Sequence, residues 1–86
     1  MSDEVKVGEI VKFFSKPSVA AIKVTDNSFS VGDELHYKGA TTDFSEVVES
    51  MEVEKEKITD AKPGDMVGIK VSERVRPGDD VFKVTG

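Results

Sequence analysis

The sequence predicts an all-β fold, a small closed β-barrel of six to seven strands. Short apolar clusters rich in β-branched and aromatic residues recur along the whole chain of 86 residues. Within the clusters apolar and polar residues alternate, which is the period of a half-buried strand. Gly, Pro, Asn and Asp separate the clusters, as expected of tight reversals. Closure into a barrel would remove exposed sheet edges, and a chain of this length should form one domain, 1–86.

The first half of the chain contains three predicted strands. Residues 5–14 form the first, with Val5, Val7, Val11 and Phe13 expected on one face. Gly8 in this strand indicates a bulge, which bends a strand around a small barrel. A turn at 15–18 precedes a second strand at 19–24, and Asp26-Asn27 supplies the next reversal. The third strand covers 34–38 and has Leu35 and Tyr37 on its inner face.

The second half is predicted to complete the barrel with three more strands. Residues 44–54 are rich in Glu, but strand spacing collects their apolar residues as well as helical spacing does, so we expect a strand. Pro63-Gly64-Asp65 is a turn, because Pro fixes φ and Gly accepts positive φ. It leads into a strand at 66–71. Pro77-Gly78-Asp79 repeats the turn before a last strand at 81–84.

Composition narrows the function classes. The chain has no Cys, which excludes disulfides, thiolate zinc sites and cysteine nucleophiles and suits an intracellular setting. It has no apolar run near the ~20 residues that a membrane span needs, and its start does not resemble a signal peptide, so we expect a cytoplasmic monomer. The net charge of −5 opposes bulk attraction to phosphate, so any RNA contact requires a local basic patch.

Several motifs in a fixed order resemble the second, β-barrel domain of translational GTPases such as elongation factor Tu and initiation factor two. They are the run from Ala20 to Leu35 with its Val31-Gly32-Asp33, then Pro63-Gly64-Asp65 with Val67-Gly68-Ile69, and finally Arg76-Pro77-Gly78-Asp79. Asn27 stands where that family usually has Gly. A similar barrel also resembles the tail domain of a collagenase-like peptidase family, without its catalytic part.

Catalysis is not expected. The phosphate-binding motif of a GTPase is missing, so the chain should not hydrolyse GTP. His36, the one side chain that ordinarily titrates near neutrality, should lie solvated on the outer face. The acidic cluster Glu46, Glu49, Glu52, Glu54 and Glu56 could bind a hard cation, but a solvated edge neutralised by Lys55 and Lys57 is the favoured interpretation. We therefore predict no enzyme, no catalytic residue, no metal and no cofactor.

Five residues are the candidate binding site. Arg74 and Arg76 flank a rigid Pro-Gly turn and suit phosphate or carboxylate recognition, and Lys16 and Lys23 could join them in a positive patch. The resemblance adds Glu52, which falls where elongation factor Tu contacts the terminal adenosine of aminoacyl-tRNA. The leading hypothesis is a module that docks on RNA or a ribonucleoprotein. The alternative is a protein-interaction adaptor that partners an enzyme lacking its own barrel domain.

Overall fold

The computed structural model describes residues 3–85, which form strands and turns and no helix. Consistent with this, the described residues contain no helix long and apolar enough to cross a membrane. The strands are β1 (Glu4–Phe14), β2 (Val19–Val24), β3 (Phe29–Ser30), β4 (Glu34–Lys38), β5 (Asp43–Val47), β6 (Met51–Val53), β7 (Glu56–Ile58), β8 (Asp60–Ala61), β9 (Met66–Lys70) and β10 (Asp80–Val84). The predicted all-β class is confirmed.

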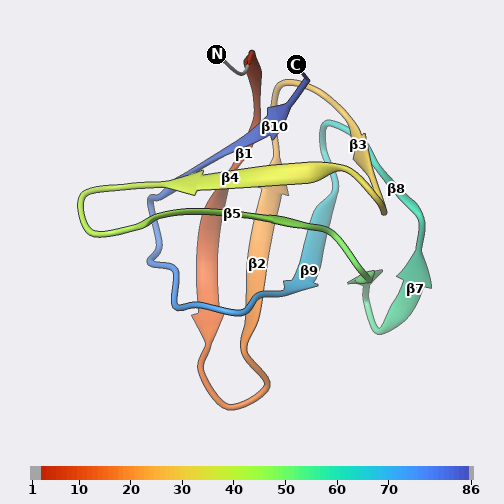
Figure 1. The fold of residues 1–86 in the computed structure, drawn as a ribbon. Coiled ribbons are helices and arrows are strands. Elements are labelled where there is room, and N and C mark those ends of the chain that lie inside the picture. The colour runs from red at the N-terminus through yellow and green to blue at the C-terminus, as the bar shows by residue number, and fades with distance from the viewer. Residues whose placement is uncertain (1–2, 86) are drawn as a thin grey trace.

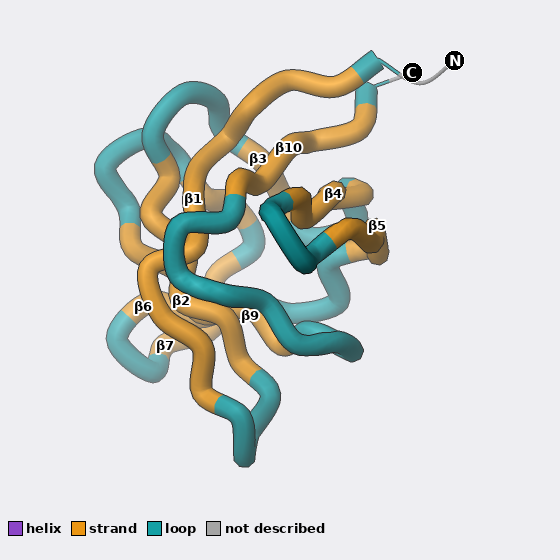
Figure 2. The backbone as a smooth tube through the Cα atoms, turned by 90° about the vertical axis from the view of Figure 1, so that its left-hand side faces the viewer, coloured by secondary structure: helices purple, strands orange, loops and turns teal. Residues whose placement is uncertain are grey.

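Eight strands make one sheet in the order β5-β4-β10-β1-β2-β9-β6-β7, and β3 pairs with β8 beside it. Adjacent strands in the order are antiparallel. In Figure 1, β4 and β5 cross β1 and β2 at a steep angle. Figure 2 shows the strands curving around a common interior, with β1 and β10 running out together toward the chain ends. No strand pair joins β5 to β7, so the pairing does not close the sheet into the expected ring.

The interior is a single cluster of apolar side chains contributed by the strands and by the segments that follow β5 and β9. It consists of Val7, Ile10, Ala20, Ile22, Val24, Phe29, Leu35, Tyr37, Val48, Met51, Ala61, Val67, Ile69, Val71, Val75 and Val81. The alternation predicted for β2, β4 and β9 is confirmed, because every second residue of these strands is buried. Burial of this apolar surface is the main force that holds the curved sheet together.

Strand β1 departs from the predicted alternation. Val7 is buried and Phe13 packs against the core, as predicted, but Val5 and Val11 are exposed and Ile10 is buried in their place, so the expected inner face is wrong at these positions. The reason is that the register of β1 shifts twice, between Lys6 and Gly8 against β10 and between Ile10 and Lys12 against β2. Each extra residue moves the following side chains to the other face.

The bulge predicted at Gly8 is confirmed by the first of these shifts. A Cβ atom at Gly8 would collide with the backbone oxygen of Lys23. No side-chain movement can relieve this collision, because the obstructing atom belongs to the backbone. Glycine is therefore required here by the close approach of β1 and β2.

Three turns share one geometry. They cover Ser30–Asp33, Lys62–Asp65 and Arg76–Asp79, and in each the amide of the fourth residue donates to the carbonyl of the first. The third residue is Gly with a φ of 95° to 99°, as in a type II turn. The Asp carboxylate at the fourth position accepts a hydrogen bond from the amide of the first residue, at 2.8, 3.1 and 2.8 Å. The side chain thus fixes the turn that its own backbone closes.

Each of these turns also forms two backbone hydrogen bonds with one buried residue of a distant segment. The Gly amide donates to the carbonyl of that residue, and the amide of the residue donates to the Asp carbonyl, all at 2.8 to 2.9 Å. The residues held in this way are Val48, Val24 and Ile10. All three belong to the core, so the turns set the positions of core side chains as well as reversing the chain.

The hairpin of β6 and β7 was not predicted, because residues 44–54 were expected to form one continuous strand. The chain instead leaves the sheet at 48–50, resumes as β6 and reverses at Glu54-Lys55. Both turn residues have positive φ, 51° and 68°, as the two-residue turns of hairpins require. Neither is Gly or Asn, so the sequence carries no signal for this turn.

Replacing Lys55 by Gly should stabilise the protein. Gly adopts positive φ without the steric cost that Lys pays, so we expect the free energy of unfolding to rise by about 1 kcal/mol. Urea denaturation followed by circular dichroism measures the change. The matched control is Lys57→Gly within β7, which should lower stability by ~0.5–1 kcal/mol. Equal effects of the two substitutions would contradict the proposed turn geometry.

Replacing Asp79 by Ala should weaken the fold more than the same change at Asp65. Asp79 is buried, so its removal leaves the Arg76 amide without a hydrogen-bond acceptor. We expect the free energy of unfolding to fall by about 1–3 kcal/mol. Asp65 is half-exposed and water can replace it, so its loss should cost about 0.5–1 kcal/mol. The comparison uses the same denaturation experiment, and a larger cost at Asp65 would refute the argument from burial.

Candidate functional site

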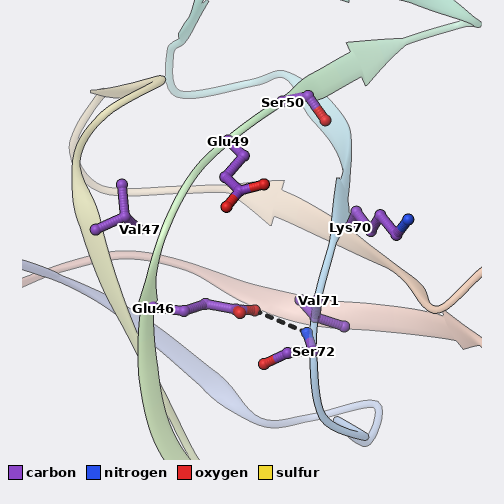
Figure 3. A pocket seen from close by; sticks show the side chains of 7 residues that line it. All are labelled: Glu46, Val47, Glu49, Ser50, Lys70, Val71 and Ser72. Carbon is purple, nitrogen blue, oxygen red and sulfur yellow. Dashed lines mark hydrogen bonds between the residues drawn. The ribbon is translucent and has the colours of Figure 1, made fainter.

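A hollow lies where the end of β5 passes the segment that follows β9. Its volume is about 260 Å³, and it is lined by Glu46, Val47, Glu49, Ser50 and residues 70–72. In Figure 3 the Glu46 and Glu49 side chains extend from the first segment toward the second. The Oε1 atom of Glu46 accepts a hydrogen bond from the Ser72 amide at 3.1 Å, and this bond ties the two segments together. A gap spanned by one side chain is too narrow for an added strand but can hold a side chain of another molecule.

Two further hollows of about 260 and 180 Å³ adjoin the first. One lies between the 49–51 segment, Val31 and residues 57–59, and the other lies between residues 50–52 and β9. Ser50 lines all three. We call this surface the Ser50 groove. Each hollow is smaller than the ~300–1,000 Å³ of ordinary small-molecule pockets, so the groove suits several side chains of one partner better than one compact ligand.

The Ser50 groove combines exposed apolar side chains with acidic ones. Val47 is 55% exposed and Val31 38%, two of the few large apolar residues on the surface. Glu46, Glu49 and Glu52 contribute carboxylates, and none of them forms an ion pair within residues 3–85. Lys55 and Lys57 therefore do not neutralise the acidic cluster through ion pairs, although Lys57 lies opposite Glu52 across β6 and β7.

Tyr37 lies in the core near this surface. Its ring packs on Phe44, with ring centroids 5.0 Å apart, and its hydroxyl is buried with no hydrogen-bond partner among the described residues. Burial raises the pKa of the Tyr37 hydroxyl, and the negative charge of Glu46 raises it further. Tyr37 therefore stays protonated at all ordinary pH values.

A second cluster surrounds His36 on the outer face of the sheet. Its Nδ1 atom lies 2.7 Å from Glu4 Oε2, and its Nε2 atom lies 2.5 Å from Asp43 Oδ1. The ring also lies beside Phe82, with ring centroids 6.3 Å apart. Glu34, Phe44, Ser45 and Val84 also line the hollow around His36. His36 is thus on the outer face as predicted, but it is held between two carboxylates rather than free in solvent.

This arrangement favours the imidazolium form, because only the charged ring has an N–H on both nitrogens and can donate a hydrogen bond to each carboxylate. The hydrogen bond with Asp43 raises the pKa of His36 above its ordinary 6.5, burial opposes the rise, and Glu4 adds to it. The same bond from His36 lowers the pKa of Asp43. The cluster therefore links the start of β1 to β4 and β5 most firmly between the two pKa values. No group of His, Asp and Glu side chains among residues 3–85 is arranged to hold a metal ion.

The structure does not gather the five predicted site residues at one place. Lys16 and Lys23 lie near opposite ends of β2, Arg74 and Arg76 lie exposed between β9 and β10, and Glu52 lies exposed on β6. Glu52 is the one of the five that lines the Ser50 groove. The role of each residue stays a prediction. The groove itself had a partial signal in the acidic cluster, but the hollows around Ser50 depend on how the chain crosses from β5 to β6.

Comparison with known proteins gives sequence relatives that are peptidases. The chain is 36% identical over 80 residues to an uncharacterized protease of Methanocaldococcus jannaschii, and 31% identical over 81 residues to a collagenase of Porphyromonas gingivalis. These matches cover 92% and 93% of this chain but 19% and 20% of the relatives, so the chain spans about a fifth of their length. No protein-family model matches the chain.

Among solved structures, the chain resembles the C-terminal domain of a protein assigned as a U32 peptidase from Geobacillus thermoleovorans. The TM-score is 0.84 at 23% identity, with 91% of this chain and 90% of that domain covered. A selenomethionine variant of the same domain gives a TM-score of 0.84 at 22% identity, covering 90% of this chain and 96% of that one. At this identity the likeness establishes a shared fold.

These findings correct the expectations drawn from the translational GTPases. The assignment to their second domain is wrong, because the relatives and structural neighbours are peptidases of the collagenase and U32 type. The expected role as a translation-factor-related module that docks on RNA or a ribonucleoprotein is therefore also wrong. The expectation that the chain is not an enzyme is also overturned, since the relatives are named as a protease and collagenases. The second resemblance, to the tail domain of collagenase-like peptidases, is the one with which the comparisons agree.

His36 should titrate above 6.5, and its cluster should stabilise the fold in acid rather than in base. A raised folded-state pKa contributes stability that is present below 6.5 and is lost as pH rises through the folded value. The lowered pKa of Asp43 contributes stability that is present above its ordinary 3.8 and is lost as pH falls through the folded value. The contribution should therefore be largest between about pH 4 and 6.5.

Comparison of the wild-type protein with His36→Gln tests this window. The unfolding midpoint of the variant should fall most near pH 5.5, and the difference should shrink by pH 9. Since His36 is the chain's one histidine, its ring protons give an unambiguous NMR titration. A titration midpoint at or below 6.5 would remove the physical basis of the cluster.

Proposed function

We propose that this chain acts as the C-terminal β domain of a U32-type peptidase and takes part in the cleavage of proteins by that enzyme. The observation that carries the proposal is the extent of the match to the C-terminal domain from Geobacillus, which includes 91% of the chain at a TM-score of 0.84. The sequence relatives point the same way, because the one from Porphyromonas is named as a collagenase.

The construction of the fold supports this role. The ends of the described chain lie together, where the Thr85 amide donates to the Asp3 carbonyl at 2.8 Å. Three Gly-Asp turns fix the backbone at Val48, Val24 and Ile10, so the domain offers a rigid outer surface. A rigid domain joined to a catalytic part at one end could position that part or its polypeptide substrate.

A closed barrel, the finer form of the predicted fold, is also a proposal. The support for it lies in the 48–50 segment, which carries the chain from β5 at one end of the sheet to β6 near the other. Val48 in that segment is held by two backbone hydrogen bonds to Gly32 and Asp33. The covalent chain and these bonds could complete the ring that strand pairing leaves open.

Exchange of domains in the Porphyromonas collagenase tests the proposed function. A chimera in which this chain replaces the matched 81 residues should cleave collagen at a rate within about tenfold of the parent. A deletion of the matched residues should lose at least about 100-fold. Release of collagen fragments from fluorescent fibrils measures both.

The controls separate a failed proposal from a failed fold. An unrelated β domain of similar size placed at the same position should be as inactive as the deletion. Circular dichroism and size-exclusion chromatography identify which chimeras are folded. A folded chimera that is as inactive as the deletion would reject the proposal, and so would a deletion that keeps full activity.

A further inference from the structure

We propose that the Ser50 groove is a docking site for an extended, basic segment of a polypeptide. The groove lies on the outer surface where β5, β6, β7 and β9 meet, and it shares no lining residue with the hollow around His36. The inference goes beyond the proposed function and does not depend on it, because the chain by itself can be tested for binding.

The shape of the groove favours a polypeptide. Its three hollows, of about 260, 260 and 180 Å³, adjoin one another around Ser50 and are each fit for one or two side chains. Val47 and Val31 lie exposed at two of them and supply the apolar contact that drives protein association. A chain with alternating side chains can fill neighbouring hollows, since its successive residues point in different directions.

The charge of the groove selects a basic partner. Glu46 and Glu49 project into the hollow of Figure 3, and Glu52 borders the adjoining one. Lys70 also lines the groove, and in Figure 3 its amino group extends away from the two carboxylates. Because no carboxylate of the groove forms an ion pair within residues 3–85, a lysine or arginine from a partner would gain a charged hydrogen bond without breaking an ion pair. Glu46 Oε1 accepts the Ser72 amide, and its second oxygen is open to such a partner.

Charge also argues against a nucleic-acid occupant. The whole chain carries −5, and the groove adds three carboxylates at the contact itself. Phosphates brought to this surface would meet like charges. A peptide that alternates lysine and valine is therefore the appropriate probe, and one that alternates glutamate and valine is its control.

Fluorescence anisotropy with the full 86-residue chain measures the binding. The lysine peptide should bind, and its affinity should fall with added salt because the contact is partly electrostatic. The glutamate peptide should not bind. Equal binding of the two peptides, or binding of a short RNA in place of the lysine peptide, would overturn the proposal.

Two substitutions of equal charge locate the contact. Glu49→Lys should weaken the lysine peptide at least about fivefold, because it places a like charge in the groove. Glu9→Lys changes the net charge equally but lies on β1, outside the three hollows, so the loss should be under about twofold. Glu49 and Glu9 are both exposed, and unfolding curves verify that both variants fold. Equal losses would show attraction by net charge alone and reject the groove.

NMR provides a readout that does not depend on the variants. Amide shifts caused by the lysine peptide should cluster at Val31 and at residues 46–52, 57–59 and 68–72. Shifts centred on His36 and Asp43 would place the peptide at the other acidic hollow and refute the assignment. Sedimentation velocity tests the remaining occupant, since a dimer dissociated by Glu49→Lys but not by Glu9→Lys would assign the groove to a second copy of the chain and overturn the proposal.

Discussion

Backbone pairing between the three Gly-Asp turns and the core is the constraint on which the fold depends. Each turn uses a Gly amide and an Asp carbonyl to hold both backbone groups of one buried residue, Val48, Val24 or Ile10. Because these groups are paired, the apolar side chains can be buried without the cost of unsatisfied amides and carbonyls. A sheet of short strands, several with only two or three residues, thereby obtains fixed corners that strand pairing alone would not supply.

The same constraint explains where surface chemistry can occur. The turn at Ser30–Asp33 holds Val48 in place between β5 and β6, and the next residues, Glu49 and Ser50, face outward on the segment that crosses between these strands. The carboxylates of the Ser50 groove are therefore carried by a backbone that is anchored at a core residue. The His36 cluster differs, because exposed side chains at the start of β1 and on β5 hold it, and its strength depends on protonation.

The elements best predicted from sequence are those in which residue type and apolar–polar alternation match the burial that the folded chain imposes. Gly8 indicated its bulge, and alternation correctly placed the buried faces of β2, β4 and β9. The inner face of β1 could not be predicted, because the second register shift, at Ile10 to Lys12, has no glycine to mark it. The Glu54-Lys55 turn was missed since its positive φ values are imposed by pairing across β6 and β7 rather than by residue type. The Ser50 groove joins segments some twenty residues apart, a proximity that no local pattern encodes.

The resemblance to the translational GTPases correctly indicated an all-β fold but gave the wrong function. Both results have the same cause. The residues that carried it are chiefly the Gly-Asp turns and the apolar residues beside them, and in the structure these close turns and position the core. Any domain built on such corners must keep them, whatever it binds, so they report the shape of the chain and not its partner. These corners therefore cannot distinguish one family from another, and the residues that do must lie outside them, where exposed positions such as Glu49 and Ser50 are found. Those residues are free to differ between families because the backbone beneath them is held by other groups.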